Sequence, residues 1–422
     1  MKFAIVTFGC RVNQADSLQL EEELRRRGAE PSRAETADLV IVNTCSVTAS
    51  ADQGTRQTIR RIARLNPAAK IVATGCYATR QAGEVAALPG VVRVVRNDDK
   101  QRLTALLDLP TSERFGSGDG PCGSPLEPGM AGRTAFTLRV QTGCDERCSY
   151  CIIPTTRGRG RSLSVDDVVR EARRVAESGF KEMALTGVHL GSYGRDLEPP
   201  SSLLDLLCAL QNADLDVSFR ISSLEPMDCT RDIVALVARS GGRFAPHFHL
   251  PLQHASDRML AAMRRPYTLA QYRTLADGIV ERLPHASIGS DVIVGFPGET
   301  DDDVTVNIEY LERSPLSHLH VFPYSDRPGT EATRMNRKVD GDAIRRRGAQ
   351  LREIGARLST RFRDRQVGTV RPGLTLEDGT SVVTDNYLKL KIAPGHRRNE
   401  RVHVRLVSED RGVVVPDRAS SA

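Results

Sequence analysis

The sequence predicts an α/β protein with three successive domains: a parallel α/β domain, a partial (β/α)6 barrel and a small β-barrel. Strand-like and helix-like segments alternate along residues 1–330, as in parallel sheets whose faces are covered by helices. Short strand-like segments separated by turn signals follow, as in small antiparallel barrels. Glycine, proline and serine supply 12 of the 23 positions 111–133, and this stretch divides the alternating part.

The first domain, residues 1–108, is predicted to contain a parallel sheet. Strands are expected at residues 2–8, 38–43, 70–75 and 91–95, and helices at 16–27 and 53–65. The segment 38–43 is almost entirely apolar, which is typical of a strand buried on both faces. Leucines at helical spacing give the first helix an apolar side, and Gly28 is expected to end it.

A linker is predicted at residues 109–133, and the second domain at 134–360. Its strands are expected at residues 135–141, 182–186, 217–221, 247–250, 288–294 and 318–323, and its helices at 165–178, 203–212, 232–240, 269–283 and 303–314. Ser164 is the expected cap of the first of these helices. Repeated strand–helix units of this kind fit a partial (β/α)6 barrel, whose functional side chains lie in the loops after the strands.

A basic helical stretch, residues 334–371, leads into the third domain, which is predicted at 361–418. The stretch contains twelve lysine and arginine residues against four acidic ones, so it carries +8 while the rest of the chain sums to −2. This asymmetry favours a polyanionic partner such as nucleic acid. A solvated helix face is the alternative, and it is the commoner explanation of a charged run.

The third domain is expected to be a β-barrel of about five strands. Strands are expected at residues 367–370, 374–376, 381–384, 388–392 and 401–407. Basic side chains of this region are candidates for phosphate contacts: Lys389, Lys391, Arg397, Arg398, Arg401 and Arg405. Tyr387 is the obvious aromatic side chain for stacking on a base.

The composition is ordinary for a globular protein, with 40% hydrophobic residues, 27% charged residues and a net charge of +6. No apolar run reaches the roughly 18 residues that a membrane span needs. The N-terminal segment becomes polar at Arg11, too early for a signal peptide. We therefore expect a cytoplasmic protein, whose nine cysteines are metal ligands or free thiols rather than disulfides.

Cys144, Cys148 and Cys151 form the pattern C-x3-C-x2-C and are called the central trio below. Thiols this close in sequence let one loop wrap a compact metal cluster. Three thiolates leave one iron of a [4Fe–4S] cluster without a protein ligand and open for chemistry. Structural zinc is the competing interpretation, but it usually has four ligands and no second pair follows closely. A disulfide knot is a third interpretation, and it is weak in a long chain with no secretory signal.

Three strands of the first domain each run into a cysteine, and these residues, Cys10, Cys45 and Cys76, are called the N-terminal trio. In a parallel sheet the carboxyl ends of the strands share one edge, where ligands gather. The three thiols are therefore expected to meet, which favours a second three-thiolate [4Fe–4S] cluster. The alternative is three unrelated buried thiols, since cysteine packs as a small hydrophobe. Cys122, in the linker, is expected to take no part.

The segment from Cys144 to Cys151 resembles the signature of the radical S-adenosylmethionine (SAM) enzymes. The resemblance implies that the open iron of the central cluster binds the amino and carboxylate groups of SAM, which is cleaved to a 5′-deoxyadenosyl radical. Candidate SAM contacts lie within this segment and after later strands: Tyr150, Gly187, Arg220, Glu225 and Gly295.

The two trios, the order of the domains and the C-terminal barrel together resemble the methylthiotransferases over nearly the whole chain. The segments 9–14, 185–191 and 222–226 look like the MtaB branch of that family. One departure is the segment 252–256, which is Leu-Gln-His-Ala-Ser where the family usually has Leu-Gln-Ser-Gly-Ser. The resemblance also implies that the third domain is a TRAM-type RNA-binding domain.

The resemblance implies an enzyme that adds a methylthio group to C2 of N6-threonylcarbamoyladenosine at tRNA position 37, next to the anticodon. The implied cofactors are two [4Fe–4S] clusters and SAM, which serves as methyl donor and radical source, and no catalytic side chain is expected beyond the cluster ligands. The implied partners are the tRNA anticodon stem-loop, an electron donor such as flavodoxin or ferredoxin, and a sulfur source, with no membrane.

The nearest alternatives are methylthiotransferases that act on isopentenyladenosine in tRNA or on an aspartate of a ribosomal protein. A non-catalytic iron–sulfur protein that binds RNA as a regulator is an alternative of another class. A zinc-ribbon-like binder is a third alternative, which metal analysis would distinguish because it would contain zinc without iron or sulfide.

Overall fold

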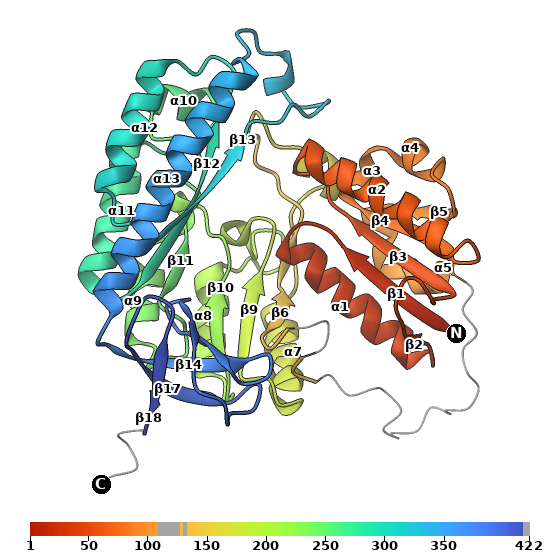
Figure 1. Ribbon diagram of the computed structural model, residues 1–422, viewed down its shortest axis with the longest axis horizontal. Helices are drawn as coiled ribbons and strands as arrows, with labels where there is room; N and C mark the ends of the chain where they lie inside the picture. The colour runs from red at the N-terminus through yellow and green to blue at the C-terminus, as the bar shows by residue number, and fades with distance from the viewer. Residues whose placement is uncertain (108–126, 130–132, 417–422) are drawn as a thin grey trace.

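The computed structural model describes residues 1–107, 127–129 and 133–416. A parallel sheet near the N-terminus lies on one side of a helix-covered barrel, and a small sheet near the C-terminus packs under the barrel in the view of Figure 1. The predicted α/β class and the order of the three parts are confirmed. Cys122 lies outside the described residues, as does most of the predicted linker.

The N-terminal sheet has five parallel strands in the order β2-β1-β3-β4-β5. The strands are β1 (Lys2–Thr7), β2 (Glu30–Pro31), β3 (Leu39–Thr44), β4 (Lys70–Gly75) and β5 (Val91–Val95). β3 is buried along its whole length because it lies in mid-sheet, with Val40 and Val42 in one core and Leu39 and Ile41 in the other. Alternate side chains of a strand point to opposite faces, so a strand covered on both sides is apolar throughout.

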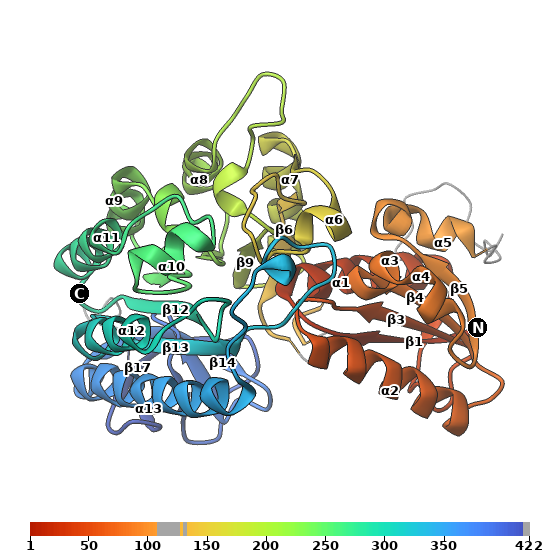
Figure 2. The ribbon, with the colours of Figure 1, turned by 90° about the horizontal axis from the view of Figure 1, so that it is seen from above.

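Helices α1 (Arg11–Arg26) and α2 (Ala49–Leu65) cover opposite faces of this sheet (Figure 2). Both begin before the predicted position, because their first turns are polar and carry no apolar period. Short helices that the sequence did not predict follow β4 and β5: α3 (Cys76–Arg80), α4 (Ala82–Ala86), the 3₁₀ helix η1 (Asn97–Arg102) and α5 (Leu103–Leu106). Elements of one or two turns are too short to display a helical period.

The central domain is the predicted partial barrel of parallel strands. Its strands are β6 (Phe136–Arg139), β9 (Glu182–Thr186), β10 (Ser218–Ile221), β11 (His247–His249), β12 (Ser287–Val294) and β13 (His318–Pro323). They pair as two sheets, β10-β9-β6 and β11-β12-β13, which a parallel bridge between Phe219 and Phe244 links. A ribbon of β7 (Gln141–Thr142) and β8 (Arg161–Ser162) accompanies the first sheet.

Helices follow the barrel strands, and most of them cover the outer side of the barrel. They are α6 (Ile153–Arg157), α7 (Val165–Glu177), α8 (Leu203–Asn212), α9 (Arg231–Arg239), α10 (Asp257–Ala262), α11 (Leu269–Arg282), α12 (Asp301–Arg313) and α13 (Gly341–Gln366), with short 3₁₀ turns η3 (Leu190–Ser192), η4 (Pro226–Asp228) and η5 (Ala332–Arg334). The predicted cap of α7 is confirmed, because the Ser164 side chain accepts a hydrogen bond from the Asp167 backbone N–H. No helix in the described ranges is long and apolar enough to cross a membrane.

The predicted basic helix is α13, and it closes the barrel rather than standing apart. Leu351, Ile354 and Leu358 are buried, and the helix packs on β13. Part of its positive charge is neutralised, since Arg347 pairs with Glu299 and Asp301 of the neighbouring α12 region. α13 also runs through residue 360, where the domain boundary was expected.

The C-terminal sheet is antiparallel, in the order β16-β15-β14-β17-β18. Its strands are β14 (Val370–Leu376), β15 (Ser381–Thr384), β16 (Lys389–Lys391), β17 (Arg401–Leu406) and β18 (Gly412–Val415). A bridge between Lys391 and Arg411 brings its two edges together, as expected for a small barrel. The strand expected at 367–370 is wrong, because Gly368 has a positive φ and the strand begins only at Val370. Of the expected phosphate contacts, Lys389, Lys391 and Arg401 form ion pairs within the protein.

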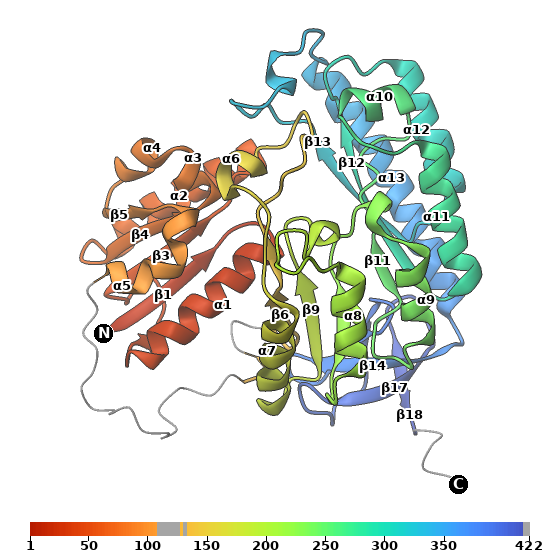
Figure 3. The same cartoon turned by 180° about the vertical axis from the view of Figure 1, so that it is seen from behind.

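The N-terminal domain docks on the barrel through its helices, as seen from behind in Figure 3. α1 packs against β6, and α3 packs against α6. These contacts bring the carboxyl-terminal edge of the N-terminal sheet to the open side of the barrel, where both cysteine trios lie.

Candidate active site

The N-terminal trio lies at the carboxyl-terminal edge of the N-terminal sheet, as predicted. Cys10 and Cys45 follow β1 and β3, Cys76 begins α3 directly after β4, and the three strands are neighbours. The backbone at Gly9 approaches Cys45 so closely that a Cβ atom on residue 9 would lie 2.4 Å from the Cys45 Sγ atom. The fold therefore gathers thiols that are far apart in the sequence.

Two of these cysteines directly follow a glycine, and only glycine fits at those positions for steric reasons. Gly9 has a φ of +88° and Gly75 a φ of +98°, in the left-handed region that side chains other than glycine rarely adopt. A Cβ atom on residue 75 would also lie 2.3 Å from the carbonyl oxygen of Thr44. Other residues at these positions would push the strand ends apart and separate the thiols.

Cys45 and Cys76 of the N-terminal trio are buried while Cys10 is exposed, and a buried guanidinium, Arg157, lies near them. Burial raises the pKa of the Cys45 thiol to about 11, and charge on Cys10 and Cys76 adds to the effect. Burial by itself lowers the pKa of Arg157, but Cys76, Asp16 and Cys10 together raise it above its ordinary value. A guanidinium in this position stabilises the thiolate form of cysteine, and the cysteines that bind an iron–sulfur cluster must be thiolates.

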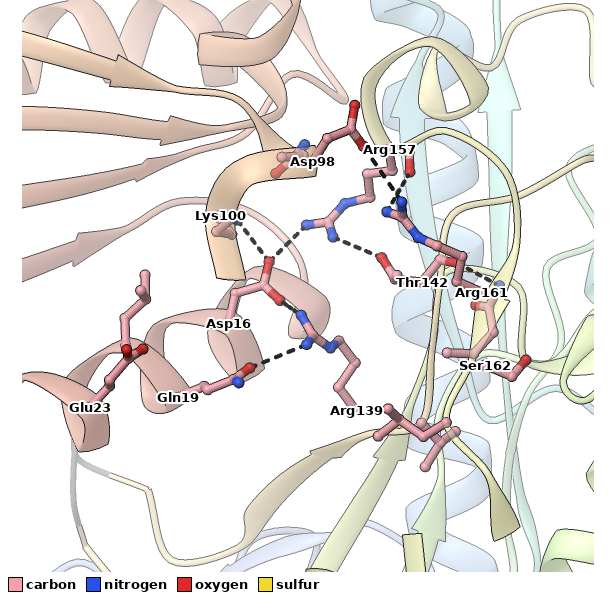
Figure 4. A pocket seen from close by; sticks show the side chains of 15 residues that line it. Asp16, Gln19, Glu23, Asp98, Lys100, Arg139, Thr142, Arg157, Arg161 and Ser162 are labelled. Atoms are coloured by element: carbon pink, nitrogen blue, oxygen red, sulfur yellow. Dashed lines mark hydrogen bonds and ion pairs between the residues drawn. The ribbon is translucent and has the colours of Figure 1, made fainter. Parts of the chain in front are cut away.

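Arg157 belongs to a buried charge network between α1 and the barrel (Figure 4). The Asp16 carboxylate pairs with Lys100 at 2.7 Å, with Arg157 at 3.4 Å and with Arg139. Burial by itself would raise the pKa of Asp16, but these cations hold it at about 2. A pocket of about 240 Å³ opens beside the network. The network fixes the N-terminal domain on the barrel and positions Arg157 at the N-terminal trio.

The central trio lies in the loop between β7 and α6, where backbone hydrogen bonds hold the loop in shape. The Cys144 N–H donates to the Gly158 carbonyl and the Cys151 N–H donates to the Cys148 carbonyl, both at 3.1 Å. Cys144 is buried, and the other two thiols are half-buried. The loop therefore presents all three cysteines at the end of the barrel from which the functional loops extend.

Arg265 is a functional candidate that the sequence analysis missed. Its Nη1 atom donates a hydrogen bond to the Cys148 Sγ atom at 3.2 Å, and its Nη2 atom pairs with Glu225. Burial lowers the pKa of Arg265, but Tyr150, Tyr267 and Cys148 raise it above its ordinary value. No motif marked this arginine, because it reaches the central trio from the loop after α10, far away in the sequence.

The donor sets fit iron–sulfur clusters better than single ions. Within the described residues, the donor atoms of His249, Asp291 and His320 all lie within 4.8 Å of one another. The sulfur atoms of neither cysteine trio lie that close to one another. Ligands of one zinc ion converge on a point, whereas ligands of a four-iron cluster bind separate irons. Burial raises the pKa of Cys144 to about 11 and that of Cys151 to about 12, so metal binding must displace protons.

Glu225 and Gly187, two of the expected SAM contacts, are linked to the central trio or to the strand that precedes it. Glu225 reaches the central trio through Arg265. Gly187 follows β9, where a Cβ atom would lie 3.0 Å from the Gln141 Oε1 atom, and that oxygen accepts hydrogen bonds from the backbone of Val188 and His189. Both positions are consistent with a ligand at the open end of the barrel, and their contact with SAM stays a prediction.

Tyr150 and Gly295 are held by packing. Tyr150 is edge-on to Phe296, with 6.5 Å between the ring centroids, and burial raises its pKa well above the ordinary value. Gly295 has a φ of +80°, and a Cβ atom there would lie 2.3 Å from the Ile344 Cγ1 atom of α13. Their contact with SAM also stays a prediction.

Arg220 has a role that the sequence did not indicate. It is buried, pairs with Glu182 at 2.9 Å, and donates a hydrogen bond to the Asp385 carbonyl at 3.0 Å. Its guanidinium also lies 4.7 Å from the centre of the Tyr387 ring. Arg220 thus fastens the C-terminal sheet to the barrel, and its expected contact with SAM stays a prediction.

The departure at residues 252–256 forms a buried turn. Gln253 has a φ of +67°, and the His254 side chain lies 3.3 Å from the Glu299 carboxylate. The His254 Nδ1 atom accepts a hydrogen bond from the Ser256 N–H at 2.9 Å. The histidine therefore replaces the usual small residue with a buried polar contact that links this turn to the loop after β12.

A cavity of about 630 Å³ lies where the three domains meet, within the size range of ligand sites. Cys10 and Arg11 line it from the N-terminal domain, Gly187 and Ser222 from the ends of β9 and β10, and Tyr387 from the C-terminal domain. Polar side chains of the barrel strands line it as well: His247, His249, Asp291, His318 and His320. The cavity therefore connects one residue of the N-terminal trio with the barrel strands and the C-terminal domain.

Two sequence families match the chain. The family described as "Uncharacterized protein family UPF0004" matches residues 2–96, which hold the N-terminal trio. The Radical SAM superfamily matches residues 138–311, which hold the central trio. The first family thus spans the N-terminal sheet and the second spans most of the barrel.

A relative from Aquifex aeolicus, the threonylcarbamoyladenosine tRNA methylthiotransferase MtaB, is 36% identical over 93% of this chain and 96% of its own length. The chain belongs to the methylthiotransferase family of radical SAM enzymes. Within that family, the MtaB of Bacillus subtilis is 34% identical over 92% of this methylthiotransferase and 89% of its own length. The ribosomal protein uS12 methylthiotransferase RimO of Saccharopolyspora erythraea is 33% identical over 97% of this methylthiotransferase and 93% of its own length. The predicted resemblance is confirmed.

Solved structures show the same fold at low identity. The radical SAM methyltransferase TsrM from Kitasatospora setae, with cobalamin and a [4Fe-4S] cluster bound, gives a TM-score of 0.55 at 16% identity and covers 78% of this methylthiotransferase and 76% of its own chain. The cobalamin-dependent SAM radical enzyme OxsB gives a TM-score of 0.52 at 11% identity and covers 84% of this methylthiotransferase and 56% of its own chain. As a radical SAM methylthiotransferase, the protein uses SAM and [4Fe–4S] clusters.

Proposed function

We propose that this methylthiotransferase adds a methylthio group to C2 of N6-threonylcarbamoyladenosine at position 37 of tRNA. The observation that supports this substrate is that relatives named MtaB from four organisms match at 30 to 36% identity over 92 to 97% of the chain. The RimO relative at 33% and the tRNA-2-methylthio-N(6)-dimethylallyladenosine synthases at 28 to 29% mark the alternatives, a ribosomal-protein aspartate and isopentenyladenosine.

In this proposal the N-terminal trio and the central trio each hold one [4Fe–4S] cluster, and SAM binds at the central one. When bound, these groups supply the 5′-deoxyadenosyl radical and the methylthio group. The chain's own residues hold the base in the cavity that Cys10 of the N-terminal trio and Gly187 of the barrel both line. Because the C2 hydrogen of adenine is not acidic, no side chain is needed as a general base.

We further propose that the anticodon stem-loop of tRNA is the macromolecular partner and that the enzyme works in the cytoplasm. An electron donor such as flavodoxin or ferredoxin and a separate sulfur source complete the reaction. Exposed arginines without an ion pair in the described part of the chain, such as Arg346 and Arg352 of α13, favour a polyanion at this surface.

The test is a comparison of tRNA nucleoside masses between a deletion strain and the same strain carrying the wild-type gene. The proposal predicts that 2-methylthio-N6-threonylcarbamoyladenosine disappears, that its unmethylthiolated precursor accumulates, and that the wild-type gene but not a Cys148→Ser variant restores the product. Loss of the isopentenyl product instead, or of a methylthiolated ribosomal-protein aspartate, would overturn the substrate. A reduced, cluster-loaded protein that forms no 5′-deoxyadenosine from SAM would favour the non-catalytic regulator.

A further inference from the structure

Arg11 is a half-buried cation at the cavity wall whose partners are neutral. Its Nη1 atom donates to the Ser222 hydroxyl and its Nη2 atom to the Tyr387 hydroxyl, each at 3.0 Å. Within the described residues it forms no ion pair, whereas Arg139 and Arg157 at the same domain boundary both pair with Asp16. An arginine held only by two hydroxyls keeps its affinity for a carboxylate, whose two oxygens match the planar guanidinium.

The cavity around Arg11 has a positive balance. Three arginines line it, Arg11, Arg157 and Arg363, and Asp291 is the one carboxylate among the described lining residues. Arg157 is already paired with Asp16, which leaves Arg11 and Arg363 as the cations without a carboxylate partner among the described residues. Asp291 is already engaged, because it lies 3.0 Å from the His249 ring and 3.2 Å from the His320 ring. These neighbours help to hold its pKa below the ordinary value although burial opposes them. An anionic ligand is therefore favoured in this cavity, and its carboxylate would meet Arg11 without competition.

Tyr387 reaches Arg11 from the C-terminal domain in a conformation that must be held in place. Its φ is +69°, a region that tyrosine rarely adopts, yet 44% of its surface stays exposed. Its ring lies 4.5 Å from the His247 ring and 4.7 Å from the Arg220 guanidinium, and the neighbouring Asn386 side chain donates to the His285 carbonyl. Strain of this kind, with the hydroxyl aimed at Arg11, is typical of a functional position.

We propose that Arg11, oriented by Tyr387 and Ser222, binds the carboxylate of the threonyl group on the substrate adenosine and so selects an anionic side chain over an apolar one. The inference rests on the proposed function and adds the residue that decides the substrate class. Arg11 directly follows Cys10 of the N-terminal trio, so the contact that recognises the side chain also places the base beside that trio.

An isopentenyl group in the same cavity would leave Arg11 desolvated and with only its two hydroxyl partners, without a counter-charge, which is unfavourable. A threonylcarbamoyl group supplies a charged partner instead, and a hydrogen bond between charged groups is the strong kind. The Arg11 guanidinium therefore favours the threonylcarbamoyl group and disfavours the isopentenyl group. Removing either the guanidinium or the carboxylate leaves the remaining charge unpaired.

The experiment measures binding of anticodon stem-loop RNAs to the cluster-loaded protein without reductant, by fluorescence anisotropy. Three RNAs are compared: one with threonylcarbamoyladenosine at position 37, one with its carboxamide analogue and one with isopentenyladenosine. For the wild-type protein we expect the acid to bind at least about tenfold more tightly than the amide. For Arg11→Leu we expect the acid and the amide to bind equally, with the isopentenyl RNA unaffected or improved.

Two further variants keep the test interpretable. Tyr387→Phe removes only the hydroxyl that orients Arg11, so the ratio of acid to amide affinity should fall by less than in Arg11→Leu. Arg26→Leu, at the exposed far end of the same helix, should keep the wild-type ratio. Iron and sulfide contents and the electron paramagnetic resonance spectra of the reduced clusters should match the wild type in all three, which separates recognition from damage to the N-terminal trio.

An Arg11→Leu protein that retains both clusters and the wild-type ratio of acid to amide affinity would overturn the inference while leaving the substrate in place. The proposed function fails in a different way: the wild-type protein would then convert isopentenyladenosine or a ribosomal-protein aspartate and would leave the threonylcarbamoyl RNA unmodified. A wild-type protein that modifies the acid RNA and binds the amide equally well would also overturn the inference alone.

Discussion

At the scale of single residues, the structure shows how side chains outside the cysteine motifs act on the trios. Arg265 is the clearest case, because one guanidinium joins a thiol of the central trio to Glu225. A buried cation beside a cluster ligand favours the reduced cluster, which carries one more negative charge. The position of Arg265 therefore has a consequence for electron transfer that can be measured.

Arg265→Leu should make the midpoint potential of the central cluster more negative by on the order of 60 mV, which corresponds to tenfold in the equilibrium for one electron. The measurement is a redox titration followed by electron paramagnetic resonance, made in a Cys45→Ser background so that only the central cluster contributes. Arg264→Leu is the matched control, since this neighbouring arginine is half exposed and pairs with Glu331. An unchanged potential in Arg265→Leu would contradict the assigned role.

His318 gives a pH dependence of stability. Burial, together with His249 and His320, lowers its pKa from 6.5 to about 4. Because the pKa is lower in the folded state, the stability that the neutral ring contributes is complete above about pH 6.5 and is lost as the pH falls toward 4. The free energy of unfolding should fall by about 2 kcal/mol between pH 7.5 and pH 5 through this group alone.

The measurement is denaturant unfolding of the cluster-loaded protein at a series of pH values, compared with His318→Gln. The variant removes the titrating ring, so its curve of unfolding free energy against pH should be flatter by that amount. Parallel curves for the two proteins would show that His318 is solvated in solution.

At the scale of elements, α1 carries the contact that unites the domains. Asp16 lies on this helix and collects three cations, Lys100 from η1 and Arg139 and Arg157 from the barrel domain. Removing one partner of a buried charge group leaves the others uncompensated, which destabilises far more than the loss of a surface pair. The docking of the N-terminal sheet, and with it the position of the N-terminal trio, depends on this one carboxylate.

Asp16→Asn should lower the free energy of unfolding by about 3 to 5 kcal/mol. It should also make α1 and β6, which pack against each other, more sensitive to limited proteolysis. Glu331→Gln, which removes an exposed ion pair with Arg264, should change stability by less than about 1 kcal/mol. Equal effects of the two substitutions would show that the network does not hold the domains together.

The sequence predicted the long elements well, because they display a period or end in a marked residue. The strands that precede Cys45 and Cys76 and the cap at Ser164 are examples. It did not predict α3 to α5, which are too short to show a period. The net charge of residues 334–371 overstated the positive charge available to a partner. Arg347 and Arg357 of α13 pair with acidic residues near α12, which neutralises part of it. A count of charges cannot show which of them face one another.

At the scale of the whole molecule, three domains share one cavity. The N-terminal domain contributes Cys10 and Arg11, the barrel contributes Gly187 and the histidines, and the C-terminal sheet contributes Tyr387. The sequence identified both cysteine trios, because strand-then-cysteine and C-x3-C-x2-C are local patterns. It missed Arg11, Arg157 and Arg265 as site residues, because their roles arise only when loops from different domains meet.

The central claim is that the two trios have separate tasks in one reaction. It is tested most directly by incubating reduced, cluster-loaded protein with SAM and an anticodon stem-loop RNA that carries threonylcarbamoyladenosine, and by measuring 5′-deoxyadenosine and the methylthiolated nucleoside together. The wild-type protein should form both products. Cys45→Ser, with about half of the iron, should form 5′-deoxyadenosine without the methylthiolated nucleoside, and formation of that nucleoside by Cys45→Ser at the wild-type rate would contradict the account.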